Sequence, residues 1–292
     1  MSLIWILLTL FYGLTKGARE LVKKKALEKS SVPCVLFLYS LLGLIFLLPD
    51  AAFSLTGTIW GLGPMQYALV AVKSFMIFIA WICSFRAIKK IPISVYSLLD
   101  LSRVIFATLL GVIVLHEVMG LNQIFGLMLV ALGLLFLRFG KKKAPEETGA
   151  VYVFMALVSC LLNALSGLMD KILTNTEAPY YVSSMQLQFW YMLFLTIFYG
   201  VYLAFSKAKH GLKDALKNPW IWLLSIMFIL ADRALFIANE IPDSKVTVMT
   251  LIKQSGCLVS IVGGRLFFKE KNIGFKLVCA GVIIAGIVIG VM

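Results

Sequence analysis

Charged residues are scarce in this sequence. Asp, Glu, Lys and Arg make up only 14% of its 292 residues, whereas apolar types make up 61% and the mean hydropathy is +0.97. A soluble domain contains about 25% charged residues, so this chain has too few to cover a water-facing surface. The composition therefore predicts a membrane protein with no room for a soluble catalytic or binding domain.

Histidine and cysteine are also rare, at two and five residues. The cysteines lie within apolar segments without CxxC spacing, at Cys34, Cys83, Cys160, Cys257 and Cys279. This pattern supports neither a disulfide framework nor a zinc site. No HExxH, GxSxG or Walker A motif is present, so we expect no enzymatic activity, no cofactor, no metal and no ATP-driven step. The first apolar block lacks a basic region before it and a cleavage site after it, which predicts a retained helix.

Apolar runs of about 20 residues, long enough to span a bilayer as a helix, recur ten times. The period-two alternation of a membrane β-barrel is absent. The predicted fold is therefore all-α, a membrane protein of ten transmembrane helices in two inverted five-helix repeats. The predicted helices are residues 2–22, 32–53, 64–86, 91–115, 120–139, 149–171, 181–206, 218–239, 245–267 and 273–291.

The repeat follows from comparing the chain with itself across a polar stretch at residues 138–148, close to the midpoint. The matched positions, at offsets of 150 and 153, are Gly17 with Gly167, Glu20 with Asp170, Ile91-Pro92-x-Ser94 with Ile241-Pro242-x-Ser244, Ser102–Glu117 with Ser255–Glu270, and Gly133 with Gly286. Because the matches keep their order, we expect two five-helix domains, residues 1–145 and 146–292. Since five is odd, the halves cross the membrane in opposite directions, as in many transporters.

Lysine and arginine are distributed unevenly between the predicted loops. The loops after helices one, three, five, seven and nine carry 18 of them, against two, Lys171 and Lys245, on the opposite side. The positive-inside rule therefore predicts that the odd-numbered loops face the cytoplasm and that both termini are extracytoplasmic. The net charge of +13 is then mostly a topology signal, and nucleic acid is not an expected partner.

Several features together resemble one family. The sequence has Tyr12-Gly13 in the first helix, a proline opening the fourth helix of each half (Pro92 and Pro242), and an acidic residue closing it (Glu117 and Glu270). This arrangement resembles the drug/metabolite transporter superfamily, specifically its EamA-like transporters, although the Gly that often precedes the closing Glu is absent. The resemblance implies a secondary transporter of small metabolites, often an exporter, with a cavity lined by helices one, three, four, six, eight and nine. That family usually keeps its termini in the cytoplasm, which differs from the orientation that the charges predict here.

Charges within membrane spans cost about 2.5–3.5 kcal/mol each on insertion scales and usually serve function. The predicted spans contain seven basic residues: Lys16, Arg19, Lys73, Arg103, Arg233, Lys253 and Lys276. Lys16 and Arg19 lie near the cytoplasmic end of the first helix, so we expect them to extend to the interface as anchors. We expect Lys276, in the first turn of the last helix, to be interfacial.

The predicted substrate-binding residues are Lys253, Lys73, Arg103, Asp100, Arg233, Asp232, Gln254, Tyr96 and Trp81. Lys73 and Lys253 lie in mid-helix with no acidic residue within four positions, so each needs a partner on another helix, a lost proton or an anionic ligand. Arg103 follows Asp100 by three residues, which suits either an internal ion pair or a substrate site. Glu270 and Glu117 are predicted to be structural, and core packing is an alternative role for the aromatic residues.

These observations favour a secondary active transporter that moves a small anionic or zwitterionic metabolite, such as an amino acid, organic acid or phosphorylated metabolite, by alternating access. A flippase and a membrane-embedded enzyme acting on a lipid-linked substrate are the alternatives. The expected partners are the small-molecule substrate, the lipid bilayer and a coupling proton or ion, with Glu20, Asp100, Asp170 and Asp232 as acidic groups for proton coupling. We expect a monomer or weak homodimer in the plasma membrane.

Overall fold

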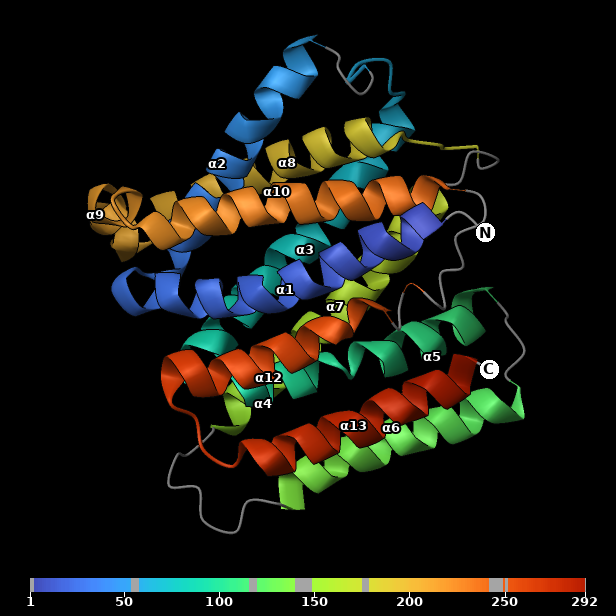
Figure 1. Ribbon diagram of the computed structural model, residues 1–292. Coiled ribbons are helices and arrows are strands. Elements are labelled where there is room, and N and C mark those ends of the chain that lie inside the picture. Colours follow the sequence, from blue (N-terminus) through green and yellow to red (C-terminus); the bar gives the residue numbers. More distant parts are fainter. Residues whose placement is uncertain are drawn as a thin grey trace.

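The computed structural model describes residues 3–53, 58–115, 120–139, 149–174, 179–241, 249 and 252–291 (Figure 1). Across these residues every regular element is a helix, which confirms the all-α prediction. The elements are α1 (Leu3–Lys29), α2 (Val32–Phe53), α3 (Pro64–Lys90), α4 (Ile93–Asp100), α5 (Arg103–Leu115), α6 (Leu121–Phe139), α7 (Ala150–Leu173), α8 (Ser184–Ala204), the 3-10 helix η1 (Lys207–Gly211), α9 (Leu212–Leu216), α10 (Pro219–Glu240), α12 (Ser255–Phe268) and α13 (Ile273–Val291).

Five of these helices are long and apolar enough to cross a membrane, namely α2, α3, α7, α8 and α10. Shorter apolar segments lie in α6, α12 and α13. A chain with several such helices is a multi-pass membrane protein, because in lipid the backbone polar groups must be satisfied within each helix.

Local sequence explains where several helices begin. Proline occupies the first position of α3 and α10, where its missing N–H costs nothing. The side chain of Asn218 accepts a hydrogen bond from the Trp220 N–H at the start of α10, and Ser183 caps α8 in the same way. The basic ends of α1 and α3 stay helical as far as Lys29 and Lys90, because lysine is a good helix former. The lysines assigned to the first two basic loops therefore lie largely on helix ends.

The prediction of a continuous fourth helix over residues 91–115 is wrong. Helix α4 ends at Asp100, the chain turns at Leu101 and Ser102, and α5 begins at Arg103. A second turn at Gln254 separates Lys253 from α12, and residues 245–248, 250 and 251 of the predicted ninth helix lie outside the described residues. The segments that match at the offset of 153 begin at these turns, with Ser102 in the first turn and Ser255 directly after the second. Discontinuous helices in corresponding positions of two halves are characteristic of transporter binding sites.

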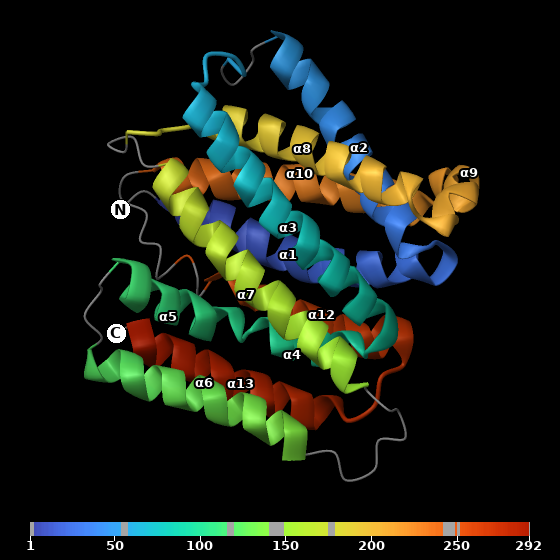
Figure 2. The ribbon, with the colours of Figure 1, turned by 180° about the vertical axis from the view of Figure 1, so that it is seen from behind.

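Pairs of helices from the two halves of the sequence form the bundle. The main pairings are α6 with α13, α1 with α10, α3 with α7, α2 with α8, α1 with α12, α5 with α7, α3 with α8, α2 with α10, and α4 with α12. Figures 1 and 2 show α6 and α13 side by side at one edge, α2 and α8 at the other, and both chain ends on one side. The repeat-matched glycines Gly133 and Gly286 both lie where α6 and α13 approach closely, since a Cβ on either would lie within 3 Å of the partner helix.

Candidate functional site

Charged side chains from seven segments meet inside the bundle. We call this group the central charge cluster; it comprises Lys16, Arg19, Lys73, Arg103, Lys253, Asp100, Asp170 and Asp232. They extend from α1, α3, α4, α5, α7, α10 and the turn before α12. These are the helices that the resemblance assigns to the cavity, counted as helices one, three, four, six, eight and nine.

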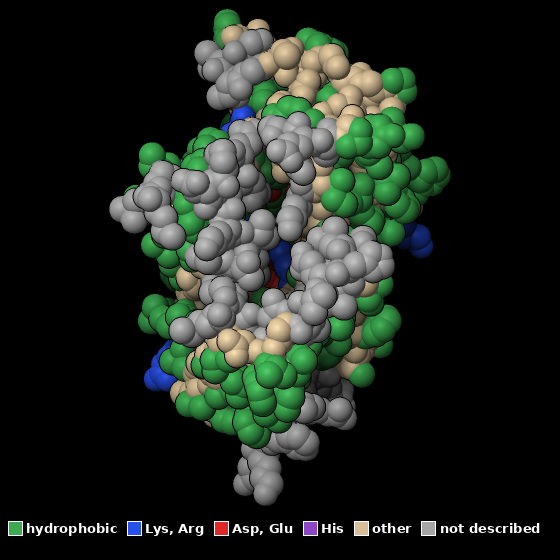
Figure 3. Space-filling model, turned by 90° about the vertical axis from the view of Figure 1, so that its right-hand side faces the viewer, with side chains coloured by type: hydrophobic (Ala, Val, Ile, Leu, Met, Phe, Trp, Pro, Cys, Tyr) green, Lys and Arg blue, Asp and Glu red, His purple; other side chains and the backbone are tan. Residues whose placement is uncertain are grey.

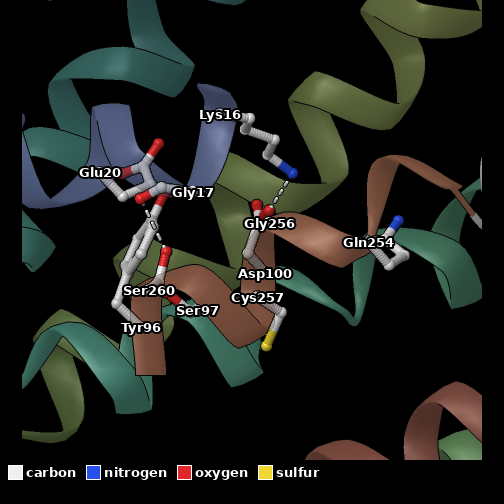
Figure 4. A pocket seen from close by; sticks show the side chains of 10 residues that line it. All are labelled: Lys16, Gly17, Glu20, Tyr96, Ser97, Asp100, Gln254, Gly256, Cys257 and Ser260. Carbon is white, nitrogen blue, oxygen red and sulfur yellow. Dashed lines mark hydrogen bonds and ion pairs between the residues drawn. The ribbon is translucent and has the colours of Figure 1, made fainter. Parts of the chain in front are cut away.

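Asp100 is the carboxylate shared by two cations. Its Oδ2 lies 2.6 Å from Lys16 Nζ, and its Oδ1 lies 2.9 Å from the Arg103 guanidinium. The predicted pairing of Asp100 with Arg103 is therefore confirmed. The expectation that Lys16 extends to the interface is wrong, because its ammonium points inward to Asp100 (Figure 4). An unpaired buried carboxylate is costly, and α1 supplies the nearest cation.

Two further ion pairs connect the halves of the chain. Lys73 is 3% exposed, and its Nζ lies 3.1 Å from Asp170 Oδ1 and 4.2 Å from the centre of the Tyr191 ring. Arg19 lies 3.3 Å from Asp232, with its guanidinium 5.0 Å from the centre of the Phe228 ring. Arg19 is thus buried and paired, which corrects the prediction that it is an interfacial anchor. Both pairs combine charge with an aromatic face, which stabilises desolvated cations.

Lys253 differs from the other cations of the cluster. No carboxylate of the described residues lies within ion-pair distance of its Nζ, which lies 6.0 Å from the centre of the Tyr12 ring. Asp170, Arg103 and Lys16 are close enough for their charges to act on it. The adjacent Gln254 is buried at 6% exposure. Lys253 therefore presents an ammonium without a matched counter-charge beside the second helix break.

A narrow cavity lies between α1, α4 and α12. Its walls are formed by Lys16, Gly17, Glu20, Tyr96, Ser97, Asp100, Gln254, Gly256, Cys257 and Ser260 (Figure 4). The space open to the centre of a water molecule is about 10 Å³, which suits roughly one water. The cavity is therefore narrow and is lined by polar groups from both halves of the chain.

Glycine makes this close approach of α1 to α12 feasible. A Cβ on Gly17 would lie 2.2 Å from the Gly256 carbonyl oxygen, and a Cβ on Gly256 would lie 2.4 Å from the Gly13 oxygen. The Ser260 hydroxyl donates a 3.0 Å hydrogen bond to the Gly17 carbonyl oxygen. Small residues with interhelical hydrogen bonds are typical of tight helix packing in membranes.

On the face of the bundle where both chain ends lie, Figure 3 shows lysine or arginine and carboxylate atoms in the interior, with apolar side chains toward the edges of the face. In Figure 1, the C-terminal ends of α1 and α12 lie on the opposite side of the bundle. The interior charges are therefore visible from the side of the termini.

Contacts near the C-terminal ends of α1 and α12 centre on Glu270, in the connection from α12 to α13. Its carboxylate accepts hydrogen bonds from the Ile93 and Ser94 N–H groups and from the Ser94 hydroxyl, and lies 3.2 Å from Lys276 Nζ. It caps α4, whose N-terminus favours negative charge, which confirms the structural role predicted for it. Lys276 is buried against Glu270, and its interfacial position stays a prediction. Burial raises the pKa of Glu270, but the Ser94 hydrogen bond and the charges of two lysines outweigh it, and the pKa lies below its ordinary value.

The remaining predicted residues lie around the cluster. Arg233 pairs with Asp50 at 2.7 Å, whereas its neighbour Asp232 belongs to the cluster. The Tyr96 hydroxyl is 2.7 Å from the Ser84 hydroxyl, and Tyr96 lines the narrow cavity. Trp81 packs among aromatic rings, its centroid 5.0 Å from that of Tyr39. Glu117 lies outside the described residues.

The sequence did not lead to Lys16, Arg19 or Asp170 as substrate-site residues. Charge within an apolar span was the available signal for all three, but depth along the helix favoured the interface for Lys16 and Arg19. Tyr191 was one of several aromatic residues considered for stacking on substrate, with packing as the alternative. No group of three or more His, Cys, Asp or Glu residues in the described part of the chain could hold a metal ion.

Comparisons with known proteins match the family resemblance. Residues 3–139 match the model of the EamA-like transporter family, which confirms the resemblance over that part of the chain. A solved structure titled "Crystal structure of protein" is similar with a TM-score of 0.60 and 13% identity, covering 96% of this chain and 97% of its own. At this identity the likeness concerns the fold alone. A search of curated proteins finds no match.

Proposed function

Because residues 3–139 are an EamA-like transporter region and the chain is a multi-pass membrane protein of the drug/metabolite transporter type, we propose that it is a secondary active transporter. It moves a small anionic or zwitterionic metabolite across the plasma membrane by alternating access, and the resemblance favours export. The observation that carries this proposal is Lys253, a cation without a matched carboxylate among the described residues, beside a broken helix.

The proposed architecture is ten spans in two inverted repeats, residues 1–145 and 146–292. The helix pairings support it, because they remain the same when the halves are exchanged. The pairing of α1 with α10 corresponds to that of α7 with α3, and the pairing of α1 with α12 corresponds to that of α7 with α5. Such an exchange is what alternating access by two inverted halves requires.

The substrate-binding residues in this proposal are Lys253, Gln254, Lys73, Arg103, Asp100 and Asp232, with Tyr96 at the cavity wall. Supporting this choice, the cluster joins both halves, so a substrate bound there contacts both moving parts. Arg233 and Trp81, paired or packed beside the cluster, position it. Asp100 and Asp170 are the carboxylates proposed for proton coupling.

The cavity between α1, α4 and α12 is narrow, and interior charges are visible from the side of the chain ends. The distribution of 18 basic residues against two supports extracytoplasmic termini. With that orientation, we propose an outward-facing state, in which the Gly17–Gly256 contact and the Glu270 cap close the cytoplasmic side.

The test is exchange of radiolabelled amino acids and organic acids by vesicles that contain the purified protein. Lys253→Met is expected to abolish exchange without loss of folding, and Lys253→Arg to retain part of it because the charge remains. Lys25→Met, at the cytoplasmic end of α1 and paired with Glu28, is the matched control. Normal exchange by Lys253→Met would contradict the assignment of the site.

A further inference from the structure

The central charge cluster has more cations than carboxylates. Among the described residues it contains five cations and three carboxylates. The neighbouring pairs of Lys23 with Glu20 and of Arg233 with Asp50 are each balanced, so counting them leaves the surplus at two. Two uncompensated positive charges inside a membrane protein are costly unless a counter-charge accompanies them.

The surplus is located at the helix breaks. Asp170 and Asp232 each have one cation at ion-pair distance. Asp100 alone serves both Lys16 and Arg103, and Lys253 has no carboxylate within that distance in the described part of the chain. One surplus charge therefore belongs to Lys253 and the other to the pair of cations around Asp100.

Backbone and hydroxyl donors lie in the same place. Helices α5 and α12 both begin at the breaks, at Arg103 and Ser255, and the N-terminus of a helix attracts negative charge. Gln254 makes no side-chain cap at the start of α12. The Ser255 hydroxyl oxygen is buried without a hydrogen-bond partner. An unused hydroxyl donor therefore lies next to Lys253, and the start of α5 lies next to Arg103.

From this arrangement we propose that the substrate is a small dianion, either a dicarboxylate or a phosphate monoester, with one anionic group on Lys253 and the other between Lys16 and Arg103. The inference rests on the proposed function and narrows its substrate class. A dianion neutralises both surplus charges. A monoanion leaves one of them, and a zwitterion leaves the net charge unchanged.

The experiment is calorimetric binding to the purified full chain at low ionic strength, where charge interactions are least screened. The probes are succinate and glycerol 3-phosphate as dianions, butyrate as a monoanion and 4-aminobutyrate as a zwitterion. At least one dianion is expected to bind about tenfold or more tightly than butyrate and 4-aminobutyrate, because one extra charge-assisted contact is worth that factor. The ratio between succinate and glycerol 3-phosphate identifies the carboxylate or phosphate class.

The variants separate recognition from stability. Lys253→Met is expected to weaken binding of the preferred dianion about tenfold or more, to change butyrate binding less than about threefold, and to raise the ligand-free melting temperature because a surplus charge is gone. Arg103→Gln removes the other surplus charge and is expected to weaken dianion binding similarly, so the conclusion does not depend on one variant folding. Lys25→Met is expected to bind like the unmodified chain.

Two kinds of result distinguish failure of the dianion inference from failure of the proposed function. Equal affinity of the unmodified chain for dianions and butyrate, or unchanged dianion binding by a folded Lys253→Met, would overturn the dianion inference while anion transport stands. If none of the four probes binds and none is exchanged by vesicles, the proposed function is overturned together with the dianion inference.

Discussion

The substitution of Gly17 by alanine tests whether the contact between α1 and α12 holds the structure in its present state. The added Cβ would lie 2.2 Å from the Gly256 carbonyl oxygen and 2.8 Å from two further Gly256 backbone atoms. Backbone cannot move aside as a flexible side chain does, so α1 and α12 must separate. The separation also weakens the hydrogen bond from the Ser260 hydroxyl to the Gly17 oxygen, now 3.0 Å long.

The expected cost combines three terms. Overpacking costs about 1–3 kcal/mol, and the weakened hydrogen bond adds about 1 kcal/mol. Alanine recovers about 1 kcal/mol of helix propensity relative to glycine. Gly17→Ala is therefore expected to destabilise the fold by about 1–3 kcal/mol.

Gly167 provides a control at the matching position of the second half, since a Cβ there meets no atom within 4 Å. Gly167→Ala is expected to be neutral or to stabilise by up to about 1 kcal/mol. Thermal unfolding of both variants in detergent is the assay, and the gap between their melting temperatures should be roughly 5–10 °C. Equal melting temperatures would show that the helices do not cross at this glycine, and the proposed cytoplasmic closure would lose its basis.

Three further predictions concern charge. Asp100→Asn leaves Lys16 and Arg103 without their shared carboxylate and is expected to destabilise the ligand-free protein by about 3–5 kcal/mol. The control Glu28→Gln, in an exposed pair with Lys25, should cost under about 1 kcal/mol. Similar melting temperatures for the two variants would count against a buried cluster. Glu270 has a lowered pKa, so its contribution to stability is present above its unfolded pKa and is lost as pH falls through its folded pKa. Glu270→Gln should therefore lose less melting temperature than the unmodified chain as pH falls below about 4.5. An unchanged dependence of melting temperature on pH would refute the stabilising role of Glu270. A reporter that fluoresces only in the cytoplasm should stay dark when fused to Met292, and a bright signal would mean that the termini are cytoplasmic.

The sequence predicted the class of the protein and the extent of most helices. Hydropathy decides these features, because an apolar run of about 20 residues in lipid can satisfy its backbone only as a helix. The predicted range 32–53 agrees with α2. The three-residue spacing of Asp100 and Arg103 indicated an ion pair as one of two roles, and the pair forms although the residues lie on separate helices, α4 and α5. The residues that match the EamA-like family extend over the same first half that supplied Asp100 and Arg103.

Tertiary structure decided which charges meet and where the helices break. Lys16 and Asp100 are 84 positions apart, and Arg19 and Asp232 are 213 apart, so no local pattern indicates that they pair. Their depth along one helix predicted that Lys16 and Arg19 extend to the membrane interface. In the fold, pairing each cation with a buried carboxylate is favoured over extending its side chain to water. The breaks at Ser102 and Gln254 carry no proline or glycine at the turn itself, since neighbouring helices and buried charges rather than local chemistry stabilise them. Packing therefore determines the surplus of positive charge among the described residues at the centre, which hydropathy alone does not reveal.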